Sequence, residues 1–88
     1  MDEDERKSYL EEHERCCDIF YKTGRAGWLS DLRRRRLLQL AGTNFNCKAF
    51  YHDYYWLCAE GLTGWCIGMA HLTPAGESEL QRLLDNGI

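Results

Sequence analysis

The chain has 88 residues, of which 44% are hydrophobic and 28% charged, and its formal net charge is −3. This composition predicts one small folded domain and argues against a disordered chain. The negative charge argues against broad attraction to DNA, RNA or anionic membranes, although a local basic patch stays compatible with it. The acidic start, Met1–Glu5, is unlike a secretory signal, and no apolar run approaches the roughly 20 residues that span a membrane, so we expect a cytoplasmic protein.

Five cysteines and three histidines are the candidate metal and nucleophilic residues. In a chain without a secretion signal, reduced thiols that pack as small hydrophobic groups are the default. A zinc site would draw on Cys47, Cys58, Cys66 and His71, but no Cys-x-x-Cys pair is present and the spacings match no zinc module. A Cys–His nucleophile lacks an orienting third group, and no phosphate-binding glycine loop occurs. We therefore expect no metal, no cofactor and no catalysis.

The first predicted element is a helix over residues 4–22. Acidic residues at its start suit the helix dipole, and Gly24 is a suitable stop. Apolar and aromatic residues recur at three- and four-residue spacing and predict one inward stripe: Tyr9, Leu10, His13, Cys16, Cys17, Phe20 and Tyr21.

A second helix is predicted over residues 30–41. Ser30 can cap its free N–H groups, Asp31 suits the first turn, and Gly42 follows as a stop. Its predicted apolar face is formed by leucines, namely Leu29, Leu32, Leu37 and Leu40.

The segment 47–59 allows two interpretations. Its Phe, Tyr and Trp residues favour a strand, whereas its apolar positions fit a helical period. A two-residue alternation would place Asp53 on the same face as Tyr51, Tyr55 and Leu57, so we favour the helix. Its inward residues would be Cys47, Phe50, Tyr54, Leu57 and Cys58.

The remaining sequence predicts a small hairpin followed by a last helix. Two short runs around glycines, within residues 61–72, indicate the hairpin. The last helix begins at Thr73 as N-cap, with Pro74 in the first helical position, and ends near Asn86 and Gly87. Its stripe is Leu80, Leu83 and Leu84. The predicted fold class is mainly α with a small β-hairpin, in the order α-α-α-β-β-α, in a single domain over residues 1–88 with residues 1–4 frayed.

Three segments in this order resemble a winged helix-turn-helix. Residues 38–43, Leu-Gln-Leu-Ala-Gly-Thr, look like the end of a second helix entering the turn. Residues 57–62, Leu-Cys-Ala-Glu-Gly-Leu, look like the end of a recognition helix passing into the wing. Residues 72–77, Leu-Thr-Pro-Ala-Gly-Glu, look like the segment after the wing in MarR- and PadR-like regulators. The resemblance covers about residues 30–84 and implies a winged-helix-like fold, with two departures: a slightly long recognition helix and a very short wing.

DNA binding is what this resemblance would ordinarily imply, through a helix in the major groove. The outer face of the predicted recognition helix carries Lys48, Tyr51, His52, Tyr55 and Trp56. Only Lys48 is reliably cationic, and the wing contains no Lys or Arg. Clustered outward Tyr and Trp are instead typical of protein-binding hot spots. The alternative is that some of these aromatics complete the core.

The one basic cluster is Arg33-Arg34-Arg35-Arg36. Consecutive residues spread around a helix, so these side chains cannot all face one ligand. Arg33 and Arg36 are expected near the apolar stripe, where they would either snorkel or pair with acids of the first helix, and Arg34 and Arg35 are expected to point away. The cluster would then be a solvated or internally paired face, a phosphate contact, or a contact for an acidic protein.

The leading hypothesis is a small non-enzymatic binding protein that acts through a protein partner. Its size and acidity also suit an inhibitor encoded by a phage or mobile element, such as an anti-CRISPR protein. One alternative is a DNA-binding transcription regulator that holds phosphates with Lys48 and Arg33–Arg36. Another is a structural subunit whose exposed aromatics are buried in a homodimer.

Overall fold

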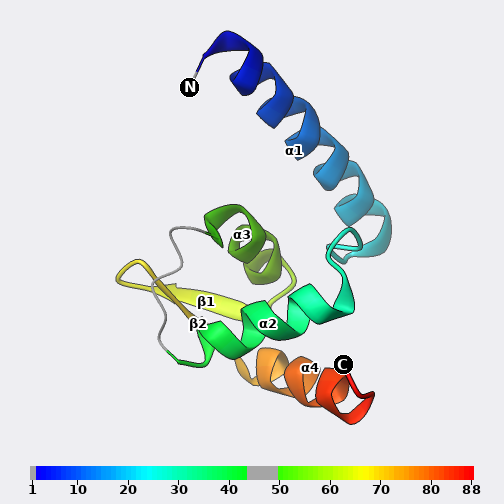
Figure 1. Ribbon diagram of the computed structural model, residues 1–88, viewed down its shortest axis with the longest axis vertical. Helices are drawn as coiled ribbons and strands as arrows, with labels where there is room; N and C mark the ends of the chain where they lie inside the picture. The colour runs from blue at the N-terminus through cyan, green and yellow to red at the C-terminus, as the bar shows by residue number, and fades with distance from the viewer. Residues whose placement is uncertain (1, 44–49) are drawn as a thin grey trace.

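Helices and one antiparallel hairpin account for the regular structure of residues 2–43 and 50–88, which the computed structural model describes (Figure 1). The elements are α1 (Glu3–Thr23), α2 (Asp31–Ala41), α3 (Tyr51–Ala59), β1 (Thr63–Cys66), β2 (Met69–Leu72) and α4 (Pro74–Asp85). This order confirms the predicted α-α-α-β-β-α fold class, mainly helical with a small hairpin. Membership of the winged-helix proteins stays a prediction.

Helix α1 has both of its ends fixed by local capping. The Asp2 carboxylate accepts a hydrogen bond from the Glu5 N–H at 2.8 Å, which satisfies one of the free donors of the first turn. At the other end Gly24 is left-handed, with φ 67°, a conformation that glycine adopts without steric cost. The helix predicted over residues 4–22 is thus confirmed to within one residue at each end.

The inward stripe of α1 is narrower than predicted. Cys16 is fully buried, and His13, Cys17 and Phe20 are half-buried. The other members of the predicted stripe, Tyr9, Leu10 and Tyr21, are 46%, 49% and 87% exposed. For Tyr9 and Leu10 the reason is visible in Figure 1, where the N-terminal half of α1 projects beyond the other elements.

Helix α2 presents a different face to the core from the predicted one. Ser30 caps it as expected, accepting from the Arg33 N–H at 3.2 Å. Its buried residues recur at helical spacing and are Arg34, Leu37, Leu38 and Ala41. Of the predicted face, Leu29 and Leu37 are buried, whereas Leu40 is half-buried and Leu32 is 44% exposed. The prediction failed because an arginine occupies a core position of the stripe.

Helix α3 settles the ambiguous segment in favour of a helix over residues 51–59. Tyr54 and Leu57 are fully buried, and the Tyr54 hydroxyl donates a hydrogen bond to the Leu37 carbonyl of α2. The strand interpretation is therefore wrong for these residues. The predicted beginning of the helix, including Cys47 and Lys48, lies outside the described residues.

Strands β1 and β2 form the predicted hairpin. Thr63 pairs with Leu72 at its base and Cys66 with Met69 at its end. Ile67 and Gly68 make the two-residue turn, with φ of 51° and 73°. Turns with positive φ at both central residues match the twist of paired strands. Ile67, 93% exposed, lies at the tip.

Helix α4 is held to the connection between α3 and β1. Thr73 caps the helix by accepting from the Gly76 N–H, and its hydroxyl also donates to the Gly61 carbonyl. The Thr73 N–H donates to the Leu62 carbonyl at 3.1 Å. The two segments that resemble winged-helix motifs, 57–62 and 72–77, therefore contact each other directly.

The core lies between α2, α3, α4 and the hairpin. Figure 1 shows α2 between α3 and α4, with the hairpin extending beside α3. The buried hydrophobic residues include Leu38, Leu57, Ala70 and Leu83. Of the predicted α4 stripe, Leu83 is buried, Leu80 is half-buried and Leu84 is 42% exposed.

Replacing Gly76 by alanine is expected to destabilise the fold strongly. A Cβ at this position would lie 1.9 Å from the Leu62 carbonyl oxygen, so the backbone of α4 or of the α3–β1 connection would have to move. Overpacking of this kind costs about 1–3 kcal/mol or more. Urea unfolding measures the effect. Gly27→Ala is the control, because its Cβ would meet only Ile19 at 3.7 Å; equal stability of the two variants would contradict the packing described.

Candidate interaction surface

The basic cluster of α2 is largely engaged within the protein. Arg34, predicted to point away from the apolar stripe, is instead 1% exposed. Its guanidinium donates two hydrogen bonds of 2.9 Å to the two carboxylate oxygens of Glu60, at the end of α3. A buried charge needs such a partner because desolvation alone is costly.

Arg33 is also paired, but its partner lies in α3 and not in the first helix, which was one of the two expected alternatives. Its Nε donates to the Asp53 carboxylate at 3.1 Å, and its guanidinium carbon lies 5.8 Å from the Phe50 ring centroid. Arg35 donates to the Gln39 side chain at 2.8 Å. Arg36 is exposed and forms no ion pair with the described residues. The cluster thus offers a ligand far less positive charge than its sequence suggests.

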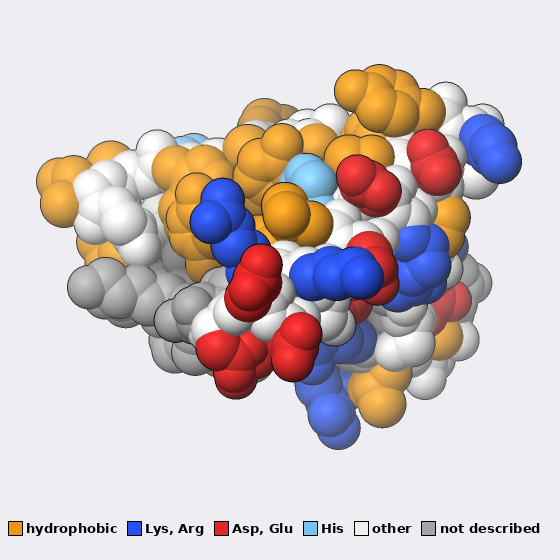
Figure 2. Space-filling model, turned by 90° about the horizontal axis from the view of Figure 1, so that it is seen from above, with side chains coloured by type: hydrophobic (Ala, Val, Ile, Leu, Met, Phe, Trp, Pro, Cys, Tyr) orange, Lys and Arg blue, Asp and Glu red, His pale blue; other side chains and the backbone are white. Residues whose placement is uncertain are grey.

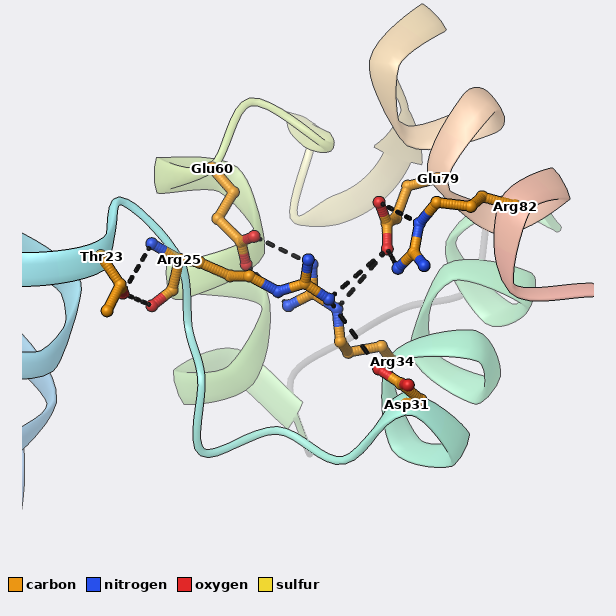
Figure 3. Close-up of polar contacts among 7 residues, drawn as sticks. All are labelled: Thr23, Arg25, Asp31, Arg34, Glu60, Glu79 and Arg82. Atoms are coloured by element: carbon orange, nitrogen blue, oxygen red, sulfur yellow. Dashed lines mark hydrogen bonds and ion pairs between the residues drawn. The ribbon is translucent and has the colours of Figure 1, made fainter. Parts of the chain in front are cut away.

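Glu79 of α4 joins the buried pair to other arginines (Figure 3). Its carboxylate oxygen lies 3.9 Å from Nε of Arg34 and 3.8 Å from the Arg25 guanidinium, and it accepts hydrogen bonds from Arg82. The hydrogen bond from Arg82 lowers the pKa of the Glu79 carboxyl. Burial acts in the opposite direction, but its effect on the pKa is smaller. The network ties α4 to α2 and to the loop before it.

The outer face of α3 is aromatic, as predicted, but Trp56 does not belong to it. Tyr51 and Tyr55 are 61% and 46% exposed, and His52 is half-buried. Trp56 is only 4% exposed and packs against Phe20 and Trp28, with ring centroids 5.5 and 5.2 Å away. It faces inward because α1 and the loop after it cover that side of α3, which the sequence of α3 alone does not reveal. Lys48 lies outside the described residues.

Helix α1 contributes two rings to this face. The Tyr9 ring lies 5.8 Å from His52, and the His13 ring lies 6.1 Å from Tyr55, between centroids. These rings and Tyr51 line a pocket of about 170 Å³ between α1 and α3. The Trp56 indole N–H donates to Nε2 of His52 at 3.3 Å and fixes that imidazole. We call this the ring pocket: Tyr9, His13, Tyr51, His52 and Tyr55.

A second hollow of about 160 Å³ adjoins the ring pocket, and Tyr55 lines both. Its other lining residues are Cys17, Phe20, Tyr21, Trp56 and Ala59. Viewed from the N-terminal end of α1, hydrophobic side chains gather around a histidine (Figure 2). The two hollows make the α1–α3 junction a continuous apolar and aromatic surface.

The hairpin extends this surface beyond α3. Trp65 of β1 is 37% exposed and lies 5.4 Å from the Tyr51 ring. Residues 61–72 contain no Lys or Arg, and neither do residues 51–59 of α3. Residues 51–59 and 61–72, the described parts of the predicted recognition helix and wing, therefore present aromatic rings and no Lys or Arg.

The thiols show no sign of a metal centre or an activated nucleophile within the described ranges. No three His, Cys, Asp or Glu residues among those described are grouped so as to hold a metal ion. Of the zinc candidates, Cys47 is outside the described residues, Cys58 is half-buried, and Cys66 and His71 are exposed. Burial raises the pKa of the Cys16 thiol, which disfavours the nucleophilic thiolate.

Comparison with protein-family models, with curated proteins and with solved structures finds no match for this chain. Among the residues that the structure describes, no helix is both long and apolar enough to cross a membrane.

Sequence reasoning located Tyr51, His52 and Tyr55 but missed the contribution of α1. Tyr9 and His13 were expected in the core stripe of that helix, and no pattern in the sequence indicates which part of α1 reaches α3. The burial of Arg34, in contrast, is indicated by a pattern in the sequence. Arg34, Leu37, Leu38 and Ala41 follow the i, i+3, i+4, i+7 spacing of a buried face.

Arg34→Met is expected to destabilise the protein by about 3–5 kcal/mol, because Glu60 would keep a buried charge without its partner. The double variant Arg34→Met/Glu60→Leu should regain much of this loss, since an apolar pair of similar volume replaces the ions. Urea unfolding of these two variants and of Glu60→Leu gives the coupling free energy between Arg34 and Glu60. Arg36→Met is the exposed control, with an expected change within about 0.5 kcal/mol. Equal effects of Arg34→Met and Arg36→Met would contradict the buried pair.

Acid should remove the contribution of Glu79 to stability. Because its folded-state pKa is lower than the ordinary value of 4.5, the contribution is present above that pH and is lost as the pH falls through the folded-state pKa. Glu79→Gln should therefore be less stable than the parent at pH 7, and the difference should shrink on acidification. Urea midpoints across this range measure it, with Glu14→Gln, on the exposed side of α1, as control. A difference that does not change with pH would contradict the lowered pKa.

Proposed function

We propose that the chain is a non-enzymatic protein-binding module. It contacts its partner through the α1–α3 face and the adjoining hairpin. The observation that carries this proposal is a set of partly exposed rings on neighbouring elements: Tyr9 of α1, Tyr51 and Tyr55 of α3, and Trp65 of β1. The sequences of α3 and β1 contain no Lys or Arg.

Tyrosine and tryptophan suit this role for a physical reason. They bury a large area on binding while losing little conformational entropy, because only two side-chain angles become fixed. Here the rings are further held by one another, as in the Tyr51–Trp65 and His13–Tyr55 contacts. A surface that is already ordered loses less freedom when a partner docks.

DNA binding by α3 is supported less well by the same residues. Affinity for DNA depends chiefly on phosphate contacts from Lys and Arg. Arg33 and Arg34 are engaged with Asp53 and Glu60, and the described part of α3 offers a phosphate only tyrosines and one histidine, His52. A net charge of −3 adds repulsion.

The test is capture of partners from the native host after nuclease treatment, which separates protein from nucleic acid. Tyr51→Ala and Tyr55→Ala should each reduce capture of the partner protein by about tenfold or more, as expected for hot-spot residues. Leu84→Ala, at an exposed apolar position of α4, is the matched control and should leave capture unchanged.

Two outcomes would overturn the proposal. One is undiminished capture by both tyrosine variants. The other is recovery of nucleic acid alone, with binding to short duplex DNA that weakens steeply with salt. Mass measurement at low concentration distinguishes a heterologous partner from a second copy of the chain.

A further inference from the structure

The ring pocket between α1 and α3 differs in chemistry from the rest of the surface. All of its lining residues, Tyr9, His13, Tyr51, His52 and Tyr55, carry ring side chains, and none is aliphatic. The adjoining hollow is also largely aromatic, but its lining includes Cys17 and Ala59, which are small and apolar. An aliphatic side chain of a partner fits the second hollow, whereas the ring pocket calls for a group that interacts with ring faces.

A cation is the group that ring faces attract. The π-system of an aromatic ring has a negative face, so an ammonium group near several rings is stabilised electrostatically. No lining residue of the ring pocket is a Lys or Arg, and the phenol oxygens of its tyrosines can accept a hydrogen bond from an ammonium group that carries an N–H. The chain is also acidic overall, which favours the approach of a cation.

The rings lie close enough together to act as one site. The Tyr9 and His52 centroids are 5.8 Å apart, those of His13 and His52 are 6.3 Å apart, and those of His13 and Tyr55 are 6.1 Å apart. The pocket volume of about 170 Å³ suits a single side-chain head group and is too small for a folded segment.

We propose that the ring pocket binds the alkylammonium group of a lysine side chain, methylated or not, presented by the partner protein. This rests on the proposed function, because it names the group of the partner that this face receives. The adjoining hollow takes a neighbouring apolar side chain, and Tyr55 separates the two.

The probe is a pair of short capped peptides that differ only in charge. One contains trimethyllysine, and the other contains its carbon analogue, in which a tert-butyl group replaces the trimethylammonium. Titration of the ¹⁵N-labelled protein is followed at the Trp56 indole N–H, which donates to His52 at the edge of the pocket. The charged peptide should shift this resonance and bind about threefold to tenfold more tightly than the neutral one.

Tyr51→Leu and Tyr55→Leu should each lose this preference, whereas Leu84→Ala, at an exposed position of α4 outside both hollows, should keep it. Equal binding of the two peptides, or binding of neither, overturns the inference. In that event, loss of partner capture by Tyr51→Ala and Tyr55→Ala would still support the proposed function. A preference for the charged peptide together with full capture by those variants would instead support the ring pocket and contradict the proposed function.

Discussion

The fold depends on one buried ion pair, between Arg34 and Glu60. Arg34 occupies a core position of α2, so folding removes its charge from water. The bidentate hydrogen bonds to the Glu60 carboxylate offset the free-energy cost of this desolvation. Such a pair adds little net stability compared with apolar packing, but losing one partner is costly. The pair therefore acts mainly by fixing how α2 packs against the end of α3.

The constraint reaches most of the described elements. Glu60 lies between the end of α3 and the connection to β1, and that connection is hydrogen-bonded to Thr73 at the start of α4. Glu79 brings α4 against Arg34 from the other side. Helix α1 takes no direct part in these contacts, and it meets α3 through the rings of the ring pocket and the buried Cys16.

This arrangement also decides what the surface can recognise. A sequence with four consecutive arginines suggests a phosphate-binding face, yet two of them neutralise acids inside the protein. The large side chains left outward on α3 are aromatic, and Trp65 of the hairpin adjoins them. The aromatic face of this scaffold, whose element order would ordinarily suggest DNA, is the reason why we propose a protein partner.

Local signals in the sequence were sufficient for the order of elements and the helix ends. Asp2, Ser30, Thr73 and Gly24 each act through neighbours in the chain, so their roles follow from local chemistry. The burial of Arg34 and Trp56 depends on contacts between elements far apart in the sequence. For the same reason the sequence predicted the tyrosines of α3 as a surface but not the pocket that Tyr9 and His13 complete.

The most direct test of the buried pair is hydrogen exchange of the arginine guanidinium groups, measured by NMR at several pH values. The two hydrogen bonds to Glu60 and the 1% exposure of Arg34 predict that its side-chain protons exchange much more slowly than those of Arg36. Exchange at Arg34 as fast as at the exposed Arg36 would show that the pair is open to solvent, and would contradict the account.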